Sequence, residues 1–600
     1  MTLYWLQNFQ KLINGIILSI LLFVSTYASA REWVSTQAMP RMQNYEWMSM
    51  SQWYQFHADD IERASQGDVE VVFLGDSITE SWTWNEESQG YFQEYFGAYR
   101  TANFGVGGDQ TQNVLWRLQH GLHVSLDPDL VVLMIGTNNL LLGQQAPEEV
   151  FAGIQAVVRQ ILENYTAARV LLMGVTPADQ NPGTANREKV SQLNEKLGAE
   201  NFGERVKYYD FGGVFLDKNG KIPQELMYDY LHPTPKGLKL WGNKISLVVH
   251  QLMKAARKER LKMPAHSEKI QVMGRSAAQA DGSLLIGYPG VSLSMTVKAK
   301  KLEMLANSSA GKSWVEVFID GASVKKIELP SVATKFTLFE SEKAKEHKVT
   351  IVHNSETWHG GTTIKQFIAY DGAWKTPPKL PSRKLLVVGD SITCGDAVIQ
   401  PESGSCEKDY SWWNASSTYG FLLAERFNAQ VHLACYGGRG IYRTWEGDTE
   451  ALTGSDIFDL AFAESEKKYS WDHNQYEPDA VIVNLGTNDF STHAGALPEE
   501  SIFVGAYVEL LNKIIRTFPK KAIFLTEGPM VSDGAENGQQ KSRLRRYLEE
   551  TQKAVGSENV HLMFSSVQGG GRCDGHPDAS VHRKMADGFA ETISKTLGWP

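Results

Sequence analysis

Residues 69–79 read VEVVFLGDSIT, a nearly continuous apolar run that leads into a Gly-Asp-Ser turn. The pattern returns at residues 383–393, which read RKLLVVGDSIT. Short apolar runs of this kind are typical of strands in a parallel sheet that is covered on both faces. The chain therefore contains two copies of one strand–turn unit, and we expect each copy to open an α/β domain.

A second apolar run follows in each copy and ends in Gly-Thr-Asn. It occupies residues 131–138, VVLMIGTN, in the first copy and residues 481–488, VIVNLGTN, in the second. Helical patterns lie among these runs, at residues 147–164, 501–517 and 543–555. Strands that alternate with helices predict a three-layer α/β/α domain of flavodoxin-like type in both copies.

The segment between the copies has a different pattern. Residues 291–297 and 314–319 alternate apolar and polar side chains, and turn residues interrupt such runs at short intervals. This pattern predicts an antiparallel β-sandwich, bracketed by a basic joint at residues 254–262 and a proline-rich joint at residues 375–381. We therefore expect four parts: a leader (residues 1–30), a first α/β domain (residues 45–260), the sandwich (residues 265–376) and a second α/β domain (residues 382–600).

Net charge and cysteine content limit the partners and the disulfide bonds that this chain can have. The chain has 600 residues, and 59 Lys and Arg against 69 Asp and Glu give a net charge of −10. The electrostatic field of a negatively charged protein does not attract nucleic acid, so nucleic acid is not expected as a partner. Four cysteines permit three pairings, and sequence cannot choose among them, although Cys394 and Cys406 flank a loop and could pair.

The first thirty residues resemble a signal peptide. Lys11 precedes an apolar run, and the small residues at 28–30 form a cleavage pattern before Arg31. The alternative is an uncleaved anchor, but the run is short for a membrane span. We therefore expect a secreted or periplasmic protein with no membrane contact after cleavage; sequence says nothing about its oligomeric state.

Each Gly-Asp-Ser turn has a candidate base and candidate oxyanion donors. A serine hydroxyl is a weak nucleophile until a neighbouring base takes its proton, and histidine is the suitable base near pH 7. Ser77 precedes His232 in an Asp-x-x-His motif, and Ser391 precedes His576 in Cys-Asp-Gly-His. Glycine amides and asparagine side chains supply the donors that an oxyanion needs: these are residues 105–108 and Asn138 in the first copy, and residues 437–440 and Asn488 in the second.

Each of these motifs is common by itself, and the plain interpretation of each is a turn or a capped helix. Four of them in the same order, twice in one chain, favour catalysis. No cluster of His, Cys and Asp has metal-ligand spacing, so neither a metal nor a cofactor is expected.

With serine, glycine, asparagine and histidine located, both copies resemble SGNH (GDSL) hydrolases. The first, residues 47–257, resembles the platelet-activating-factor acetylhydrolase-like branch in residues 72–79, 103–109, 115–118 and 229–232. The resemblance implies Ser77 as nucleophile, His232 as base and Asp229 as the residue that orients it. It also implies an oxyanion hole made by the backbone N–H groups of Ser77 and Gly108 and the Asn138 side chain.

The sandwich and the second copy, residues 269–599, together resemble carbohydrate esterase family two. That resemblance rests on residues 287–290, 389–395, 486–489 and 573–577, and it implies a jelly-roll-like sandwich before the hydrolase domain. It implies Ser391 as nucleophile, His576 as base, and Gly438 and Asn488 as oxyanion donors, with Gly437 and Gly440 competing for the glycine role. The position three before His576 is Cys573, so Asp574 or a backbone carbonyl must orient the imidazole.

These resemblances imply a serine esterase that removes acetyl groups from polysaccharides or oligosaccharides, with two active sites. One rival is a broader short-chain or lipid acetylhydrolase, and another is a glycan-binding protein with only one active copy. Aromatic residues between 439 and 479 and at 410–413 could form a sugar platform or pack a local core. Trp82 and Trp84, close after Ser77, could line its pocket.

Overall fold

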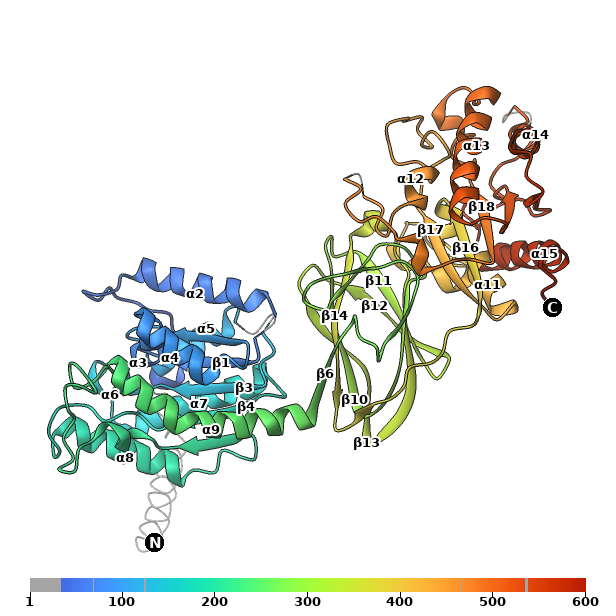
Figure 1. The fold of residues 1–600 in the computed structure, drawn as a ribbon. Coiled ribbons are helices and arrows are strands. Elements are labelled where there is room, and N and C mark those ends of the chain that lie inside the picture. The colour runs from blue at the N-terminus through green and yellow to red at the C-terminus, as the bar shows by residue number, and fades with distance from the viewer. Residues whose placement is uncertain (1–33, 68, 123–125, 465, 535–537) are drawn as a thin grey trace, which may run out of the picture. The chain divides into compact units, whose positions relative to one another are not determined.

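The computed structural model describes residues 34–67, 69–122, 126–464, 466–534 and 538–600. The predicted signal peptide, residues 1–30, lies outside the described residues. The chain divides into two compact units between Lys258 and Glu259 (Figure 1). Within the described ranges, no helix is long and apolar enough to cross a membrane.

The first unit contains domain I (residues 34–259), which is built on a five-stranded parallel sheet with strand order β2-β1-β3-β4-β5. Its strands are β1 (Val71–Gly75), β2 (Thr101–Gly105), β3 (Leu130–Met134), β4 (Arg169–Met173) and β5 (Val206–Tyr209). Its helices are α2 (Met50–Ser65), α3 (Ser77–Glu80), α4 (Glu86–Phe96), α5 (Thr111–Gln119), α6 (Thr137–Leu141), α7 (Pro147–Asn164), α8 (Ala185–Ala199) and α9 (Pro235–Glu259).

Successive side chains of β1 lie on opposite faces of this sheet. Val72 and Leu74 pack with residues of α5, α7 and α8, whereas Val71 and Phe73 pack with residues of α4 and α9. Because both faces are covered, the strand is apolar at every position, as the sequence pattern predicts. The result is the expected three-layer α/β/α domain.

The second unit begins with the central β domain (residues 260–374), a ten-stranded antiparallel sheet. Its strands are β6 (Arg260–Pro264), β7 (Gln271–Met273), β8 (Ala277–Ala278), β9 (Leu284–Ile286), β10 (Ser292–Ser308), β11 (Ser313–Ile319), β12 (Ala322–Leu329), β13 (Thr334–His353), β14 (Thr362–Tyr370) and β15 (Ala373–Trp374). The long strands β10 and β13 pair with each other through two register shifts. The expected joint at residues 254–262 is not a free linker, because α9 continues to Glu259 and β6 pairs with β14.

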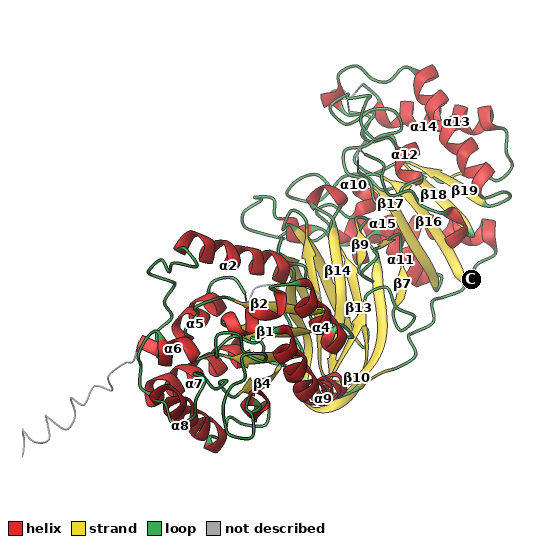
Figure 2. Ribbon diagram, turned by 60° about the vertical axis from the view of Figure 1, so that its left-hand side comes forward, coloured by secondary structure: helices red, strands yellow, loops and turns green. Residues whose placement is uncertain are grey.

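Domain II (residues 383–600) repeats the architecture of domain I, with strand order β17-β16-β18-β19-β20. Its strands are β16 (Arg383–Gly389), β17 (Ala429–Cys435), β18 (Ala480–Asn484), β19 (Ala522–Thr526) and β20 (Val560–Leu562). Its helices are α10 (Ser391–Cys394), α11 (Tyr419–Arg426), α12 (Gly454–Phe458), α13 (Glu500–Thr517), α14 (Gln540–Val555) and α15 (Ala579–Leu597). Leu385 and Val387 pack with α11 and α15, and Leu386 and Val388 pack with α13 and α14. Figure 2 shows these helices beside the strands of the sheet.

The central β domain and domain II share one hydrophobic core. Buried side chains of β10 and β13 belong to the same cluster as those of α13 and α14. Arg275 is fully buried at this junction and donates hydrogen bonds to the carbonyls of Phe458 and Leu460 at 2.8 and 2.9 Å. Tyr288 donates its hydroxyl to the carbonyl of Ile457 at 3.1 Å. These buried polar contacts fix the β domain against domain II.

Candidate active sites

Ser77 and Ser391 occupy the first position of a short helix at the carboxyl end of a central strand. α3 begins at Ser77 after β1, and α10 begins at Ser391 after β16. In both turns the preceding aspartate, Asp76 or Asp390, caps the helix by accepting the N–H two residues ahead at 3.0 Å. Open sheets of this kind bind ligands at their carboxyl edge, so both hydroxyls lie where a substrate is expected.

At site one, the Ser77 hydroxyl, the His232 imidazole and the Asp229 carboxylate form a continuous chain. Ser77 Oγ lies 2.9 Å from His232 Nε2, and His232 Nδ1 lies 2.6 Å from Asp229 Oδ2. The second oxygen of Asp229 accepts the backbone N–H of His232 at 2.7 Å. Burial alone would raise the pKa of Asp229, but these hydrogen bonds outweigh it and lower that pKa. The ionised carboxylate therefore holds the ring with Nε2 toward the hydroxyl.

The loop after β2 lies against Ser77 at site one. Gly108 has a φ of +77°, a backbone conformation that favours glycine, and a Cβ there would come within 3.1 Å of the side chains of Arg41 and Tyr45. Asn138 donates its side-chain amide to the carbonyl of Asp109 at 3.0 Å, which fixes that amide beside the loop. The structure thus brings together the predicted donors of the first copy.

At site two, Ser391 Oγ lies 2.9 Å from His576 Nε2, the same distance as at site one. Asp574 accepts the backbone N–H of His576 at 3.0 Å, and its Oδ1 lies 3.3 Å from Nδ1 of the ring. This contact is longer than the 2.6 Å bond between Asp229 and His232, and it comes from the same oxygen that accepts the backbone N–H. Asp574 is therefore close to the imidazole but holds it less firmly than Asp229 holds His232.

Two charged residues that the sequence did not indicate complete site two. Asp396 Oδ2 lies 3.6 Å from His576 Nε2, and Lys408 Nζ lies 3.0 Å from Asp396 Oδ1 and 2.8 Å from Asp574 Oδ2. Asp396, Asp574 and His576 are the one group within the described part of the chain whose ligand atoms could surround a metal ion. Lys408 already supplies a positive charge between the two carboxylates. It also lies over the Trp413 ring, 4.7 Å from its centre.

The two carboxylates shift the titration of the site-two base. Burial alone would lower the pKa of His576, but its contacts with Asp574 and Asp396 outweigh burial and raise that pKa. Burial would likewise raise the pKa of Asp574, yet its contacts with His576 and Lys408 lower it well below the usual range. The charge pattern therefore favours the protonated imidazole that forms when the serine loses its proton.

The loop after β17 corresponds to the oxyanion loop of site one. Gly389 pairs with Cys435 in the sheet as Gly75 pairs with Gly105, so Gly438 corresponds to Gly108, and its φ is +73°. Gly437 and Gly440 do not have positive φ.

Asn488 repeats the contact made by Asn138. Its side-chain amide donates to the carbonyl of Arg439 at 2.9 Å, and Arg439 follows Gly438 as Asp109 follows Gly108. Gly438 and Asn488 therefore occupy the positions predicted for the donors of the second copy.

The cysteines form two disulfides that the sequence could not assign. Cys394 pairs with Cys435, and Cys406 pairs with Cys573. The suggested pairing of Cys394 with Cys406 is wrong, because Cys394 follows the Ser391 turn and faces the end of β17. The Cys406–Cys573 bond joins the loop that carries Lys408 to the loop that carries His576.

A cleft of about 910 Å³ opens over Ser391. Two exposed tryptophans line this cleft. Trp445 is 41% exposed, and Trp358 of the central β domain is 43% exposed. Most other predicted platform rings lie in cores: Phe458, Phe462, Tyr476, Trp412 and Trp413 are buried. The platform interpretation therefore suits Trp445, and no sequence motif indicated Trp358.

Site one also has exposed rings beside its imidazole. Trp84 is 42% exposed, and its ring centre lies 5.4 Å from that of His232. The exposed Tyr228 stacks with the His232 ring, at 6.0 Å between ring centres. Trp82 does not line the pocket as expected: it is fully buried against Phe92 and Trp241.

Two family models match the chain. The model of the GDSL-like lipase/acylhydrolase family matches residues 73–240 and 387–587, and that of the carbohydrate esterase 2 N-terminal domain matches residues 272–378. An acetylxylan esterase/glucomannan deacetylase of Cellvibrio japonicus is 37% identical over 335 residues, which cover 56% of this chain and 91% of that protein. Platelet-activating factor acetylhydrolase IB subunit alpha1 of Homo sapiens is 38% identical over 187 residues, or 31% of this chain and 75% of that protein.

Solved structures show the same likeness. A family two carbohydrate esterase from Cellvibrio japonicus superposes with a TM-score of 0.54 at 36% identity, covering 57% of this chain and 98% of that one. A family two carbohydrate esterase from Clostridium thermocellum, solved with cellohexaose, gives a TM-score of 0.50 at 24% identity, covering 55% and 100%, and supports the fold alone. The chain therefore belongs to the GDSL-like lipase/acylhydrolase family, whose domain it contains twice, and is a serine carboxylic ester hydrolase.

Proposed function

We propose that this protein is an exported carbohydrate O-acetylesterase with two active sites. The observation that carries the proposal is the pair of serine–histidine contacts, each 2.9 Å, at the carboxyl edges of two similar sheets. Neither copy lacks a group that the reaction needs, which argues against a binding protein with one inactive copy. Export rests on the signal-peptide pattern of residues 1–30.

The same two-step reaction is assigned to both sites. The histidine Nε2 takes the serine proton as Oγ attacks the acetyl carbonyl carbon, and the negative charge moves to the carbonyl oxygen. The amides of Gly108 and Asn138, or of Gly438 and Asn488, would stabilise that oxygen. The imidazolium then returns the proton to the departing sugar oxygen, which leaves an acetyl-serine. Water attacks this ester by the same proton path and releases acetate and the free serine.

A carbohydrate substrate is best supported for site two. The match to the Cellvibrio japonicus esterase covers nearly the whole length of that protein, and the carbohydrate esterase 2 N-terminal model matches residues 272–378 of the central β domain and the joint after it. The cleft over Ser391 is lined by charged and polar groups and by the faces of Trp358 and Trp445. Exposed indole rings suit the C–H faces of sugar rings, and the polar groups suit their hydroxyls.

A second candidate function applies to site one alone. Domain I is similar to platelet-activating factor acetylhydrolase subunits, which favours a small acetylated lipid as its substrate. The exposed rings of Trp84 and Tyr228 beside His232 suit a sugar equally well. Both substrates carry an acetyl ester, so the chemistry assigned to Ser77 is the same.

Acetate release from acetylated xylan, mannan, pectin and xyloglucan by the wild type and by Ser77→Ala and Ser391→Ala tests this function. We expect Ser391→Ala to lose deacetylation of at least one polysaccharide. We expect Ser77→Ala to lose a different part of the acetate that the wild type releases. An acetylated short-chain phospholipid in the same panel separates the two candidates for site one. Full wild-type rates on every substrate for both variants would contradict the two-site proposal.

A further inference from the structure

The backbone N–H that precedes the oxyanion glycine is bound by a glutamate in both copies. At site one, Gly107 donates its N–H to Glu80 Oε2 at 2.6 Å. At site two, the equivalent Gly437 donates its N–H to Glu356 Oε2. An added Cβ would come within 3.1 Å of the carboxylate oxygen at Gly107 and within 2.9 Å at Gly437, so the lack of a side chain permits the close approach at both positions.

The second oxygen of each glutamate also has the same kind of partner. Glu80 Oε1 accepts the indole N–H of Trp84 at 3.2 Å, and Glu356 Oε1 accepts the indole N–H of Trp413 at 3.0 Å. In both copies, therefore, one carboxylate is held by a tryptophan on one side and holds the oxyanion loop on the other. We call this arrangement the carboxylate clamp.

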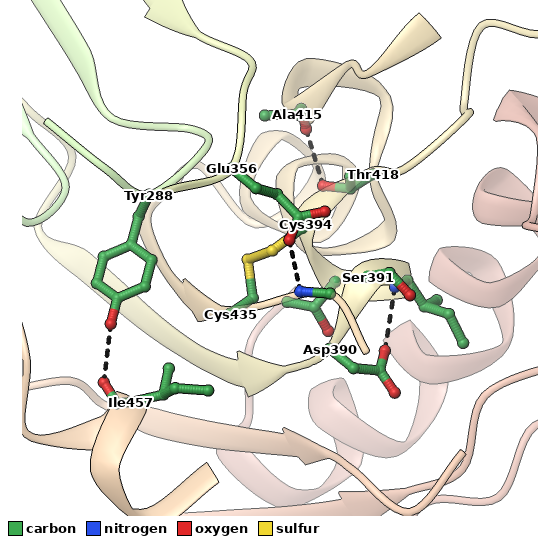
Figure 3. The surroundings of a disulfide bond; sticks show 12 residues. Tyr288, Glu356, Asp390, Ser391, Cys394, Ala415, Thr418, Cys435 and Ile457 are labelled. Carbon is green, nitrogen blue, oxygen red and sulfur yellow. Dashed lines mark hydrogen bonds between the residues drawn. A yellow bond between two sulfur atoms is a disulfide. The ribbon is translucent and has the colours of Figure 1, made fainter. Parts of the chain in front are cut away.

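The two clamps come from different parts of the fold. Glu80 follows Thr79 in the serine turn itself, and the position after Thr393 in domain II is Cys394. Cys394 is bonded to Cys435 at the end of β17, so the local glutamate is absent from the second copy. Figure 3 shows Glu356 of the central β domain beside this disulfide, and both Glu356 and Ser391 line the site-two cleft.

We propose that Glu356 is a positioning residue through which the central β domain sets the oxyanion loop of site two, as Glu80 does for site one. The inference rests on the proposed esterase function of site two. Glu356 does not touch the reacting atoms. It fixes the Gly437 peptide, and the next residue, Gly438, carries the N–H assigned to the oxyanion. Glu356 is fully buried and directly precedes η4 (Thr357–His359), so its side chain has little freedom to leave the loop.

The test uses Glu356→Gln in a Ser77→Ala background, with hydrolysis of 4-nitrophenyl acetate as the readout. Glutamine keeps the size of the side chain but replaces one acceptor oxygen by an N–H₂ donor, which either Gly437 or Trp413 must then face. We expect kcat to fall about 10- to 100-fold while KM changes less than about twofold, because a displaced oxyanion donor acts on the transition state. Glu80→Gln in a Ser391→Ala background should likewise lower kcat at site one with little change in KM.

Glu316→Gln is the matched control. Glu316 is also a buried carboxylate of the central β domain, and it contacts domain II by accepting the Asn414 side-chain amide at 2.9 Å, away from the oxyanion loop. We expect this variant to keep kcat within about twofold. An equal loss of kcat in Glu316→Gln and Glu356→Gln would overturn the proposal, because it would show a general effect of weakened domain contact.

A second variant covers the case in which Glu356→Gln does not fold. Trp413→Phe keeps an aromatic ring and the carboxylate but removes the indole N–H that orients Glu356, and we expect a smaller loss of kcat at unchanged KM. A folded Glu356→Gln or Trp413→Phe enzyme with wild-type kcat would contradict the positioning role. If the Ser77→Ala parent itself shows no activity, the esterase function of site two fails instead, and the two failures are thereby distinguished.

Discussion

Site one is assembled by a single domain, whereas site two is assembled by two. In domain I, one short helix supplies both Ser77 and the clamp residue Glu80. In domain II, the corresponding helix ends at Cys394, and the clamp comes from Glu356 of another domain. The comparison shows that a duplicated fold can keep the position of a functional carboxylate while changing the part of the chain that provides it.

The two sites also differ in how the imidazole is held. Asp229 makes a 2.6 Å hydrogen bond to His232, while Asp574 only approaches His576 at 3.3 Å and shares Lys408 with Asp396. Site one therefore depends on one directed hydrogen bond, and site two on a group of charges. A single substitution should accordingly be more damaging at site one.

The largest expected effect is common to both sites. Asn138→Ala and Asn488→Ala, each with the other site inactivated by its Ser→Ala change, should lower kcat by about 10²–10³-fold, because each removes one assigned oxyanion donor. Steady-state hydrolysis of 4-nitrophenyl acetate measures both. A loss confined to one of the two variants would show that the oxyanion holes are not equivalent.

The next effect separates the sites. Asp229→Asn should lower kcat at site one by about 10²-fold or more, because an amide can favour the wrong imidazole tautomer. Asp574→Asn should cost less than about tenfold at site two, since its contact with Nδ1 is long, at 3.3 Å, and Asp396 also lies beside the imidazole. Equal losses at the two sites, measured in the same single-site backgrounds, would refute the distinction between a directed bond and a charge group.

Removal of a disulfide should affect only site two. The Cys406→Ser, Cys573→Ser double variant frees the Lys408 loop from the His576 loop, and we expect about a tenfold lower rate at site two because the imidazole is less well placed. The activity of site one should not change, because all four cysteines lie in the second unit. A similar loss at both sites would point to a cause other than loop placement.

The smallest effect is a shift in pH dependence. The histidine must be neutral to act as a base. A raised pKa of His576 therefore moves the acid limb of the pH–rate profile of site two to higher pH. Asp574, Asp396, Lys408, Asp390 and His582 are the charged or titratable groups that face this imidazole. Asp396→Asn removes an anion, lowers that pKa and should move the limb about 0.5–1 unit toward lower pH. A pH–rate profile of the Ser77→Ala enzyme with and without Asp396→Asn provides the measurement, and a shift toward higher pH would contradict it.

The parts of each site that recur as short motifs could be predicted from the sequence. The expected helix at residues 147–164 is α7 with the same bounds. The Ser, Gly and Asn positions followed from the strands that they come after, and the His positions from the short Asp-containing motifs near the end of each copy. Glu356, Asp396 and Lys408 carry no motif, and Glu356 reaches Gly437 across 81 residues of chain. A signal for the clamp was nevertheless present in the sequence, because Glu80 and Cys394 differ at one position of an otherwise identical turn.

Covalent labelling measured by intact mass tests most directly whether both copies carry an activated serine. Diethyl 4-nitrophenyl phosphate transfers one diethylphosphoryl group to a serine oxygen and releases 4-nitrophenolate, so the mass gain counts reactive hydroxyls. We expect two groups on the wild type, one on Ser77→Ala, one on Ser391→Ala and none on the double variant. A wild type that accepts one group at saturation, with one single variant unchanged in labelling, would contradict two working sites.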